Sequence, residues 1–520
     1  MNEFYQADTE ILTFDLETQG THDDIAPSIP FRQPRMNISR PLSHHAVSRA
    51  DHPALIEGDR VVRYGELDAL VSRTADHLSQ LGMERGDVVG VALSDSIDHV
   101  VTMFALARSG LVMLPLDWRW TPAEQVRVAV AFGAAHVLTE QGALPLEGCA
   151  AIPVDDTWHD EVAACDASRE WPDEGGPLLM SLSSGTTGSP KGPCLTHEQF
   201  WRRFFGHWIN LGFNAQDVYV SATPLYYGGG RTFAMLLLYS GGTVVLFSPP
   251  YKPPELCEEL ARRGATATFL VPTLLRRLLT LDDEVLAPMR NMRLVLSSGA
   301  ALYPEEDKIM RERICAGLVC YYSSSEGGGI SYMNGVDADL RPDSVGRPVF
   351  GVTVQCVDDT HQPLASGEVG RIRYRGPAVA SGYHNDVVAS AEAFRDGWYY
   401  PGDLGMIDAA GYLFLKGRSK DMIIRGGVNV YPGEIEAFLN AHPAVRESSV
   451  VGWPSREFNE EIAAFVILQS NIDPEQLRQL CRGALAPYKV PRQVFVVDEL
   501  PRNALGKVLK ADLTARLPQL

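Results

Sequence analysis

The sequence has few of the features that mark membrane-spanning or nucleic-acid-binding proteins. Its most apolar stretch, residues 233–247, is interrupted by Ser240, Gly241 and Gly242 and is shorter than the roughly 20 apolar residues that span a bilayer. Lys and Arg number 46 against 65 Asp and Glu, which leaves a formal net charge of −19. A nucleic-acid-binding protein normally carries a basic face, so nucleic acid is disfavoured as a substrate.

Signs of secretion and of a zinc site are also missing. The eight cysteines include no C-x-x-C pair, and the closest two, Cys315 and Cys320, have no nearby His to complete a zinc pattern. Residues 1–25 hold several Asp and Glu but no Lys or Arg, the reverse of a signal or transit peptide. We therefore expect reduced cysteines and a cytoplasmic protein.

The length and the hydrophobic pattern indicate several domains. A chain of 520 residues is too long for one core, and 45% hydrophobic with 21% charged residues is an ordinary globular composition. Helical patterns alternate with short β-branched runs over residues 64–137, and again over 217–246 and 266–295, as in βαβ units that build a parallel sheet. Residues 352–383 form short apolar runs separated by Gly and Pro, which predicts antiparallel strands or a barrel.

A second domain is expected after a charged, Gly-containing stretch at residues 415–430. Beyond it the pattern predicts a helix at 432–441, strands at 448–453 and 462–468, and a helix capped by Asp473 with Pro474 at its first position. The predicted fold class is α/β multidomain. It comprises a large N-terminal domain of βαβ sheets plus a small barrel-like subdomain (residues 1–419) and a small mobile α+β C-terminal domain (residues 420–520).

The strongest local signal is Ser183-Ser-Gly-Thr-Thr-Gly-Ser-Pro-Lys-Gly192, which follows a strand-like apolar run. Glycines allow backbone N–H groups to approach phosphate oxygens, hydroxyl groups add donors, and Lys191 adds a positive charge. The loop is not a Walker P-loop, because that motif requires Gly-Lys-Ser/Thr in succession. A capped helix should follow, with a capping box at Thr196 and Gln199 and a buried face made of Phe200, Phe204 and Trp208.

This loop resembles the signature of the adenylate-forming superfamily, which includes acyl- and aryl-CoA ligases, peptide-synthetase adenylation domains and beetle luciferases. Further motifs of the family recur in order, so the resemblance covers about residues 43–510. It implies that Lys191 is catalytic and that ATP is bound by Ser183, Ser184, Gly185, Thr186, Thr187 and Gly188.

Two further motifs carry implied nucleotide contacts. Tyr322-Ser-Ser-Ser-Glu326 is similar to the family's Tyr-Gly-x-Thr-Glu, which implies that Tyr322 lies near adenine, Ser325 contacts the α-phosphate and Glu326 is a magnesium ligand. Ser323 replaces the usual Gly. Asp403 resembles the family's aspartate that accepts hydrogen bonds from the ribose diol, although Pro401 replaces the common Thr. Arg418 resembles a second anchor beside the ribose and phosphate.

The C-terminal part carries residues implied in two half-reactions. Lys507 resembles the family's catalytic lysine, whose ammonium stabilises charge on the α-phosphate during adenylation. Lys420 resembles the hinge about which the small domain rotates, and Gly426 and Gly427 are candidates on the thiol side.

The acyl pocket of the family is lined here by residues 224–231, 299–301 and 327–329, with Tyr227, Arg231, Gly299, Ala300 and Gly327 as candidate contacts. Tyr227 stands where many relatives have His, which removes imidazole chemistry. Arg231 could pair with a second carboxylate of a dicarboxylic acid. The alternative for this residue is a structural ion pair.

The resemblance implies a ligase that activates a carboxylic acid with ATP and Mg²⁺, releases pyrophosphate, and transfers the acyl group from the adenylate to coenzyme A. Alternatives are an acyl-AMP ligase that loads a carrier protein, a non-catalytic sensor of nucleotide or acyl ligand, and a luciferase-like oxygenase. A homodimer is compatible with the resemblance, and the sequence leaves open whether the acid is fatty, aryl or dicarboxylic.

Overall fold

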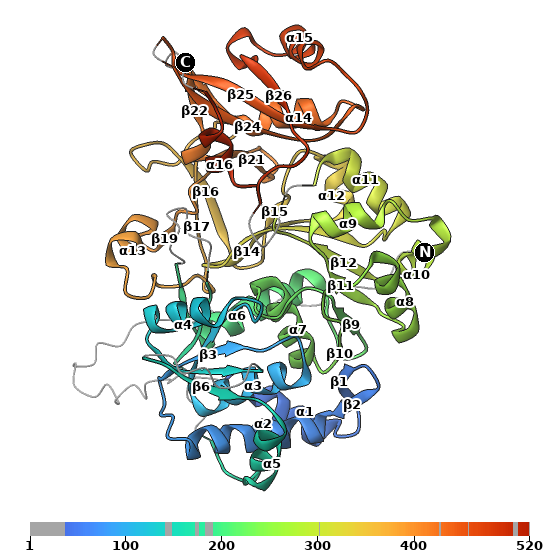
Figure 1. Ribbon diagram of the computed structural model, residues 1–520, viewed down its shortest axis with the longest axis vertical. Helices are drawn as coiled ribbons and strands as arrows, with labels where there is room; N and C mark the ends of the chain where they lie inside the picture. The colour runs from blue at the N-terminus through green and yellow to red at the C-terminus, as the bar shows by residue number, and fades with distance from the viewer. Residues whose placement is uncertain are drawn as a thin grey trace, which may run out of the picture.

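The computed structural model describes residues 37–140, 148–171, 176–182, 191–300, 302–425, 428–455, 457–502 and 508–518. Within these residues, helices and strands alternate through most of the first 340 positions and strands dominate afterwards (Figure 1). None of the helices in these ranges has the length and apolar character needed to cross a membrane. All eight cysteines lie in the described ranges and are free thiols, as the sequence predicts.

Two large sheets share the main core. The six-stranded sheet has the order β6 (Ala150–Pro153), β5 (Ala134–Thr139), β3 (Val88–Ala92), β4 (Val112–Pro115), β7 (Pro177–Met180) and β8 (Cys194–Thr196). The nine-stranded sheet has the order β15 (Arg347–Pro348), β14 (Gly328–Met333), β13 (Leu318–Ser324), β12 (Leu294–Ser297), β11 (Ala267–Phe269), β9 (Val218–Ser221), β10 (Thr243–Leu246), β1 (Pro53–Glu57) and β2 (Arg60–Arg63). Most pairs in both sheets are parallel, so the predicted βαβ arrangement is confirmed.

Thirteen helices of the described ranges accompany these sheets and the next one along the chain. They are α1 (Arg40–Ser48), α2 (Tyr64–Gln80), α3 (Ile97–Ser109), α4 (Pro122–Ala131), α5 (Asp156–Ala164), α6 (His197–Leu211), α7 (Gly228–Ser240), α8 (Pro253–Arg263), α9 (Pro272–Leu278), α10 (Asp283–Arg290), α11 (Pro304–Arg313), α12 (Gly335–Leu340) and α13 (Val387–Ala393). One apolar core runs between the two sheets and contains residues of α2, α3, α6 and α7.

The predicted antiparallel region is a six-stranded sheet. It consists of β16 (Thr353–Val357), β17 (Gly370–Arg375), β18 (Phe394–Arg395), β19 (Trp398–Tyr399), β20 (Asp403–Ile407) and β21 (Leu413–Arg418), and every described pair in it is antiparallel. The predicted antiparallel strands are therefore confirmed, and Figure 1 shows them between the large sheets and the C-terminal elements.

The C-terminal elements build a five-stranded sheet of their own. Its strands are β22 (Ile423–Arg425), β23 (Val428–Val430), β24 (Val445–Ser455), β25 (Asn459–Leu468) and β26 (Gln493–Val496), accompanied by α14 (Pro432–Asn440), α15 (Pro474–Ala484) and α16 (Lys510–Ala515). The side chain of Asp473 accepts a hydrogen bond from the backbone N–H of Glu475, so the predicted cap is present. Two apolar cores contain only residues after position 420, and Figure 1 shows these elements at the end of the molecule opposite α2 and α5.

The helix after the phosphate loop agrees with the sequence in its start and differs in its buried face. Thr196 and Gln199 form the predicted capping box of α6. Phe200 and Phe204 are buried, but Trp208 is 42% exposed, so its predicted burial is wrong. Trp208 follows Phe200 by eight residues. At about 100° per residue, its side chain points about 80° away from the direction of Phe200. His207, seven residues after Phe200, returns to the buried face.

Candidate active site

The antiparallel strands β20 and β21 position the first group of site residues. Asp403 and Arg418 lie directly opposite each other in this pair, and Arg418 Nε is 3.2 Å from Asp403 Oδ1. The hydroxyl of Tyr322, near the end of β13, donates to Asp403 Oδ2 at 2.5 Å. Burial and the nearby Asp403 carboxylate raise the pKa of Tyr322 well above its usual value, so the phenol keeps its proton. The structure thus brings together the three residues predicted for adenine and ribose.

Glu326 and Lys191 both contact Tyr383, which the sequence does not mark as a site residue. The buried Glu326 lies in the turn between β13 and β14, and Tyr383 donates its hydroxyl proton to Glu326 Oε1 at 3.0 Å. Lys191 Nζ lies 5.1 Å from the centroid of the Tyr383 ring, within cation–π range. Tyr383 therefore links the candidate magnesium ligand to the last part of the phosphate loop. No motif marks this tyrosine in the sequence.

Arg203 of α6 binds the main chain of the same turn and is also not predicted from the sequence. Its guanidinium donates to the carbonyl oxygens of Ser325 (3.0 Å), Glu326 (2.7 Å) and Ala378 (3.2 Å). Burial lowers the pKa of Arg203 to about 10, which leaves it charged at neutral pH. An arginine on the apolar face of a predicted helix was the available signal, because such a residue is seldom buried without partners.

Gly327 allows this turn to pack against the antiparallel sheet. A Cβ at this position would lie 2.2 Å from the hydroxyl oxygen of Tyr374. That hydroxyl is hydrogen-bonded to Ser324 Oγ at 2.6 Å, and the Gly327 N–H donates to the same Oγ at 3.0 Å. The side-chain-free position is therefore required by close packing around the Glu326 turn.

Tyr227 and Gly299, two candidates for the acyl pocket, lie close together in the structure. Tyr227 is the residue before α7, and its hydroxyl oxygen would lie 3.4 Å from a Cβ on Gly299. Gly299 has a φ of +98°, a conformation that side chains disfavour. Ala300 follows it at the exposed end of β12. Ser323, which replaces the usual Gly, forms a hydrogen bond with Ser298 at 2.9 Å and so joins the ends of β12 and β13.

Arg231 is almost fully buried, at 2% exposure, and has backbone partners. Its Nη1 donates to the carbonyl oxygens of Leu225 (3.1 Å) and Tyr226 (3.0 Å). Burial lowers its pKa to about 9, and the positive charge of Arg203 acts in the same direction. No carboxylate of the described residues forms an ion pair with Arg231, so the structural ion pair considered from the sequence is not found there.

Several predicted residues lie outside the described ranges. These are Ser183, Ser184, Gly185, Thr186, Thr187 and Gly188 of the phosphate loop, Gly426 and Gly427 on the thiol side, and Lys507. Lys420 is described and lies in the short 3₁₀ turn Ser419–Asp421, immediately after Arg418.

Glu326 suits a magnesium ion that is held mainly by phosphate oxygens. Among the described ranges no group of three His, Cys, Asp or Glu side chains could enclose a metal. Mg²⁺ commonly takes only one or two protein carboxylates and completes its shell with water and substrate phosphates. Glu326 is buried, and no described Lys or Arg forms an ion pair with its carboxylate, so its charge is available to a cation.

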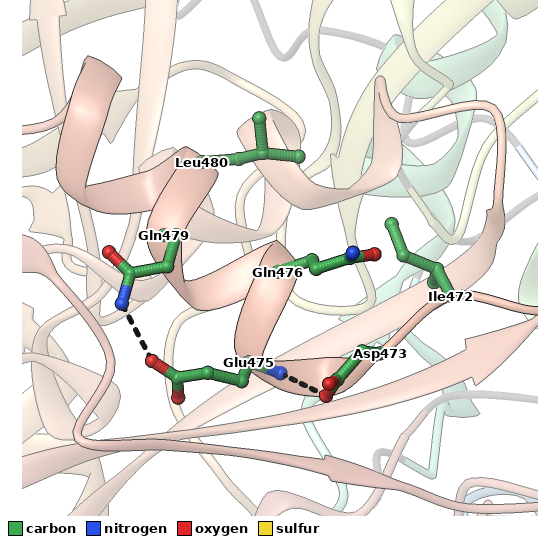
Figure 2. Close-up of a pocket in the computed structure, with 6 residues that line it drawn as sticks. All are labelled: Ile472, Asp473, Glu475, Gln476, Gln479 and Leu480. Atoms are coloured by element: carbon green, nitrogen blue, oxygen red, sulfur yellow. Dashed lines mark hydrogen bonds between the residues drawn. The ribbon is translucent and has the colours of Figure 1, made fainter.

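A surface hollow on the C-terminal domain contains none of these residues. Ile472, Asp473, Glu475, Gln476, Gln479 and Leu480 line it along the first turns of α15 (Figure 2). Within it, Gln479 donates to Glu475 Oε1 and the Glu475 N–H donates to Asp473 Oδ1. The contact of Asp473 caps the start of α15. We assign the hollow no role in the chemistry.

Comparison with known proteins connects this geometry to a family. Residues 42–384 match the family model described as AMP-binding enzyme, and residues 434–507 match the AMP-binding enzyme C-terminal domain. The chain is 32% identical to an indoleacetate–CoA ligase of Aromatoleum aromaticum, over 92% of this chain and 98% of that protein.

Two solved structures share the fold along nearly the whole chain. ATP-bound MatB from Rhodopseudomonas palustris superimposes with a TM-score of 0.84 at 30% identity, covering 92% of this chain and 99% of that one. The anthranilate CoA ligase AuaEII in complex with anthranoyl-AMP gives a TM-score of 0.83 at 26% identity, covering 93% and 97%. The chain belongs to the AMP-binding enzyme family and is an AMP-forming acid–thiol ligase.

Proposed function

We propose that this ligase activates an aromatic monocarboxylic acid. The observation that carries the proposal is a group of rings packed around α7, directly after the segment that holds Tyr227. The Phe233 ring lies 5.3 Å from the rings of His207 and Phe269 and 6.3 Å from that of Tyr321, measured between centroids. Aromatic side chains favour contact with another ring at these separations.

Glycine at the start of α7 supports a flat substrate. A Cβ on Gly229 would lie 2.7 Å from the Phe269 ring and 3.4 Å from the Tyr227 ring, so bare backbone packs between two aromatic side chains. We propose that a planar acid packs against the rings that line this stretch of backbone. The indoleacetate and anthranilate ligases, which this chain resembles, are named for aromatic acids.

The environment of Arg231 favours a single carboxylate on the substrate. Its guanidinium donates to the carbonyls of Leu225 and Tyr226 and is nearly inaccessible. Because the side chain is 2% exposed, a second substrate carboxylate would have to enter the core to reach it. We therefore propose a monocarboxylic acid and not the dicarboxylic acid that the arginine suggests on sequence grounds.

We assign the remaining site residues as the resemblance implies. Tyr322 would flank adenine, Asp403 and Arg418 would bind ribose, and the phosphate-loop residues with Ser325 would bind the phosphates. A carboxylate oxygen of the acid attacks the α-phosphorus, the bond to pyrophosphate breaks, and Lys507 stabilises the charge on the α-phosphate oxygens. The thiol of coenzyme A then attacks the acyl carbon, loses its proton, and AMP departs. Glu326 would hold a magnesium ion, which when bound would neutralise phosphate charge.

The boundary at residue 419 and the rotation about Lys420 are part of the proposal. The separate apolar cores after position 420 support a C-terminal unit that moves as one body. A carrier protein as an alternative acceptor, a homodimer and a cytoplasmic location remain predictions from the sequence. Size-exclusion chromatography with light scattering tests the homodimer directly.

The test is pyrophosphate release from ATP and Mg²⁺ with a panel of acids, each with and without coenzyme A. We expect turnover with arylacetic or benzoic acids that requires coenzyme A, and little with malonate or medium-chain fatty acids. Preference for a dicarboxylic or fatty acid would contradict the substrate class. A single burst that coenzyme A does not extend would contradict coenzyme A as the acceptor and favour a carrier protein.

A further inference from the structure

We infer that Asp95 and Arg231 are positioning residues of the ligase, which hold the segment 224–227 from opposite sides and thereby place Tyr227. The inference rests on the proposed assignment of this segment to the acyl pocket. Neither residue needs to touch the substrate. Their role is to determine where the wall of the pocket stands before the acid binds.

Asp95 provides the negative side of this clamp. It follows β3, is only 5% exposed, and its Oδ1 accepts the Leu225 N–H at 2.7 Å, although the two residues are 130 positions apart. The backbone carbonyl of Asp95 accepts a hydrogen bond from Ser248 Oγ at 2.6 Å, so the loop that carries the carboxylate is itself fixed. Burying a carboxylate is costly, and a charge-assisted bond to a main-chain N–H offsets part of that cost.

Arg231 provides the positive side. Its Nη1 bridges the carbonyl oxygens of Leu225 and Tyr226, while its Nε has no acceptor among the described residues. Both main-chain polar groups of Leu225 are thus bound by buried charged side chains of opposite sign. Such an arrangement restricts the peptide planes on both sides of this residue.

A third contact fixes the outer side of the segment. Arg119 Nη2 donates to the Tyr226 hydroxyl at 2.6 Å, and its guanidinium is held by Asp117 through bonds of 2.9 and 2.7 Å. Tyr227, the next residue, immediately precedes α7, and its hydroxyl lies near Gly299. The clamp therefore acts on the acid through Tyr227. A general loss of stability would instead affect the binding of the acid and of ATP alike.

The experiment compares two substitutions of Asp95 with a matched control. Asp95→Ala removes the acceptor, whereas Asp95→Asn keeps an oxygen that can accept the Leu225 N–H. The control is Asp76→Ala on α2. Asp76 is also a buried carboxylate; it accepts the backbone N–H of Asp166 at 3.3 Å and forms an ion pair with Arg169. Each variant is assayed for the KM of the best acid of the panel and for the KM of ATP.

We expect Asp95→Ala to raise the KM of the acid by about tenfold and to change the KM of ATP by less than about twofold, because a buried N–H left without an acceptor shifts the segment. Asp95→Asn should recover most of the affinity for the acid, and Asp76→Ala should change neither KM. Equal rises in both KM values for Asp95→Ala, or a rise in the KM of the acid for Asp76→Ala, would overturn the inference.

Two further variants keep the outcome decisive. If Asp95→Ala does not fold, Tyr226→Phe releases the segment from Arg119 alone, and an unchanged KM for the acid in that variant would count against the clamp. Tyr227→Ala tests the underlying assignment of the pocket. An unchanged KM for the acid in Tyr227→Ala would contradict the proposed pocket, whereas a changed KM in Tyr227→Ala with none in Asp95→Ala would contradict only the clamp.

Discussion

At the scale of single residues, the site depends on side chains whose partners come from distant segments. Glu326 lies in a turn, Tyr383 in the segment between β17 and α13, and Lys191 at the end of the phosphate loop, yet the side chain of Tyr383 contacts both charged groups. The Tyr383 hydroxyl thus orients the Glu326 carboxylate without neutralising its charge. This arrangement suits a group that must bind a cation only when the nucleotide arrives.

Substituting Glu326 should weaken the response to magnesium. An amide oxygen can still accept the Tyr383 hydroxyl, but it carries no charge and is a poorer ligand for a hard cation. We expect Glu326→Gln to raise the Mg²⁺ concentration for half-maximal pyrophosphate release on the order of tenfold. Glu259→Gln is the control, because Glu259 is also buried but pairs with Arg262 and Arg263 of its own helix. An equal shift in the control would contradict the assignment of Glu326.

Asp95 should make the free energy of unfolding depend on pH. Burial raises the pKa of its carboxyl from 3.8 to about 6, so the folded protein holds a proton at pH values where the unfolded chain has lost it. The resulting stability is fully present below pH 4 and is lost as the pH rises through about 6. The shift corresponds to about 3 kcal/mol.

Asp95→Asn should remove this dependence because the amide does not titrate. Relative to the unsubstituted protein, the variant is expected to gain up to about 3 kcal/mol between pH 4 and pH 7.5, measured by urea unfolding at several pH values. Parallel stability curves for the two proteins would show that Asp95 keeps an ordinary pKa. Asp76→Asn serves as the comparison, because its partners hold the pKa of Asp76 below the usual value.

At the scale of elements, α6 shows how a helix can serve both packing and chemistry. Phe200 and Phe204 enter the main core, while Arg203 on the same side reaches the carbonyls of the Glu326 turn. The sequence pattern predicts the helix and its capping box but extends the buried face to Trp208. That prediction failed because spacings of four accumulate an angular error, and the true face returns after seven residues, at His207.

The turn between β13 and β14 should not tolerate a side chain at Gly327. A Cβ there would lie 2.2 Å from the Tyr374 hydroxyl, so Gly327→Ala must displace either the tyrosine or the turn that carries Glu326. We expect a loss of about 1–3 kcal/mol in stability and a higher KM for ATP. Gly483→Ala in α15 is the control, where nothing lies near the added methyl group and helix propensity favours Ala by about 0.5–1 kcal/mol. A Gly327→Ala enzyme with unchanged melting temperature and KM would contradict the packing argument.

At the scale of the whole molecule, a polar contact joins the described parts of the small C-terminal domain and the large one. Asn440 of α14 donates to the Tyr303 hydroxyl at 2.5 Å across the predicted boundary. Domains joined by a short segment are expected to reorient relative to each other. Both half-reactions could then use one nucleotide site with different residues of the small domain.

Lys507 should be needed for only one half-reaction. Removing a cation that stabilises the α-phosphate typically slows the reaction about 10²-fold to 10³-fold. We expect Lys507→Ala to lose adenylate formation to this extent while it still transfers the acyl group from a preformed adenylate to coenzyme A. Lys510→Ala is the control, because Lys510 binds Glu436 and the carbonyl of Val450. Equal loss of both half-reactions in Lys507→Ala would contradict the two-orientation account.

Restricting Lys420 should separate the half-reactions in a different way. Proline fixes φ and cannot follow a large backbone rotation. We expect Lys420→Pro to slow the complete reaction by about tenfold or more while one half-reaction persists, and Lys420→Ala to remain close to the unsubstituted enzyme. Rates are compared by single-turnover assays of each step. Full turnover in Lys420→Pro would place the hinge elsewhere.

The sequence by itself determined the reaction class, because the phosphate loop and the other motifs are contiguous and carry their chemistry in residue type and order. It also determined the parallel sheets, the capped start of α6 and the separate C-terminal pattern, since periodicity and capping are local properties. Only the tertiary structure decided that Tyr383 joins Glu326 to Lys191, that Arg203 supports the turn, and that Asp95 binds Leu225. These contacts link residues up to 192 positions apart, those of Lys191 and Tyr383. Which distant segments meet depends on how the sheets stack, and no local pattern of residue types encodes that.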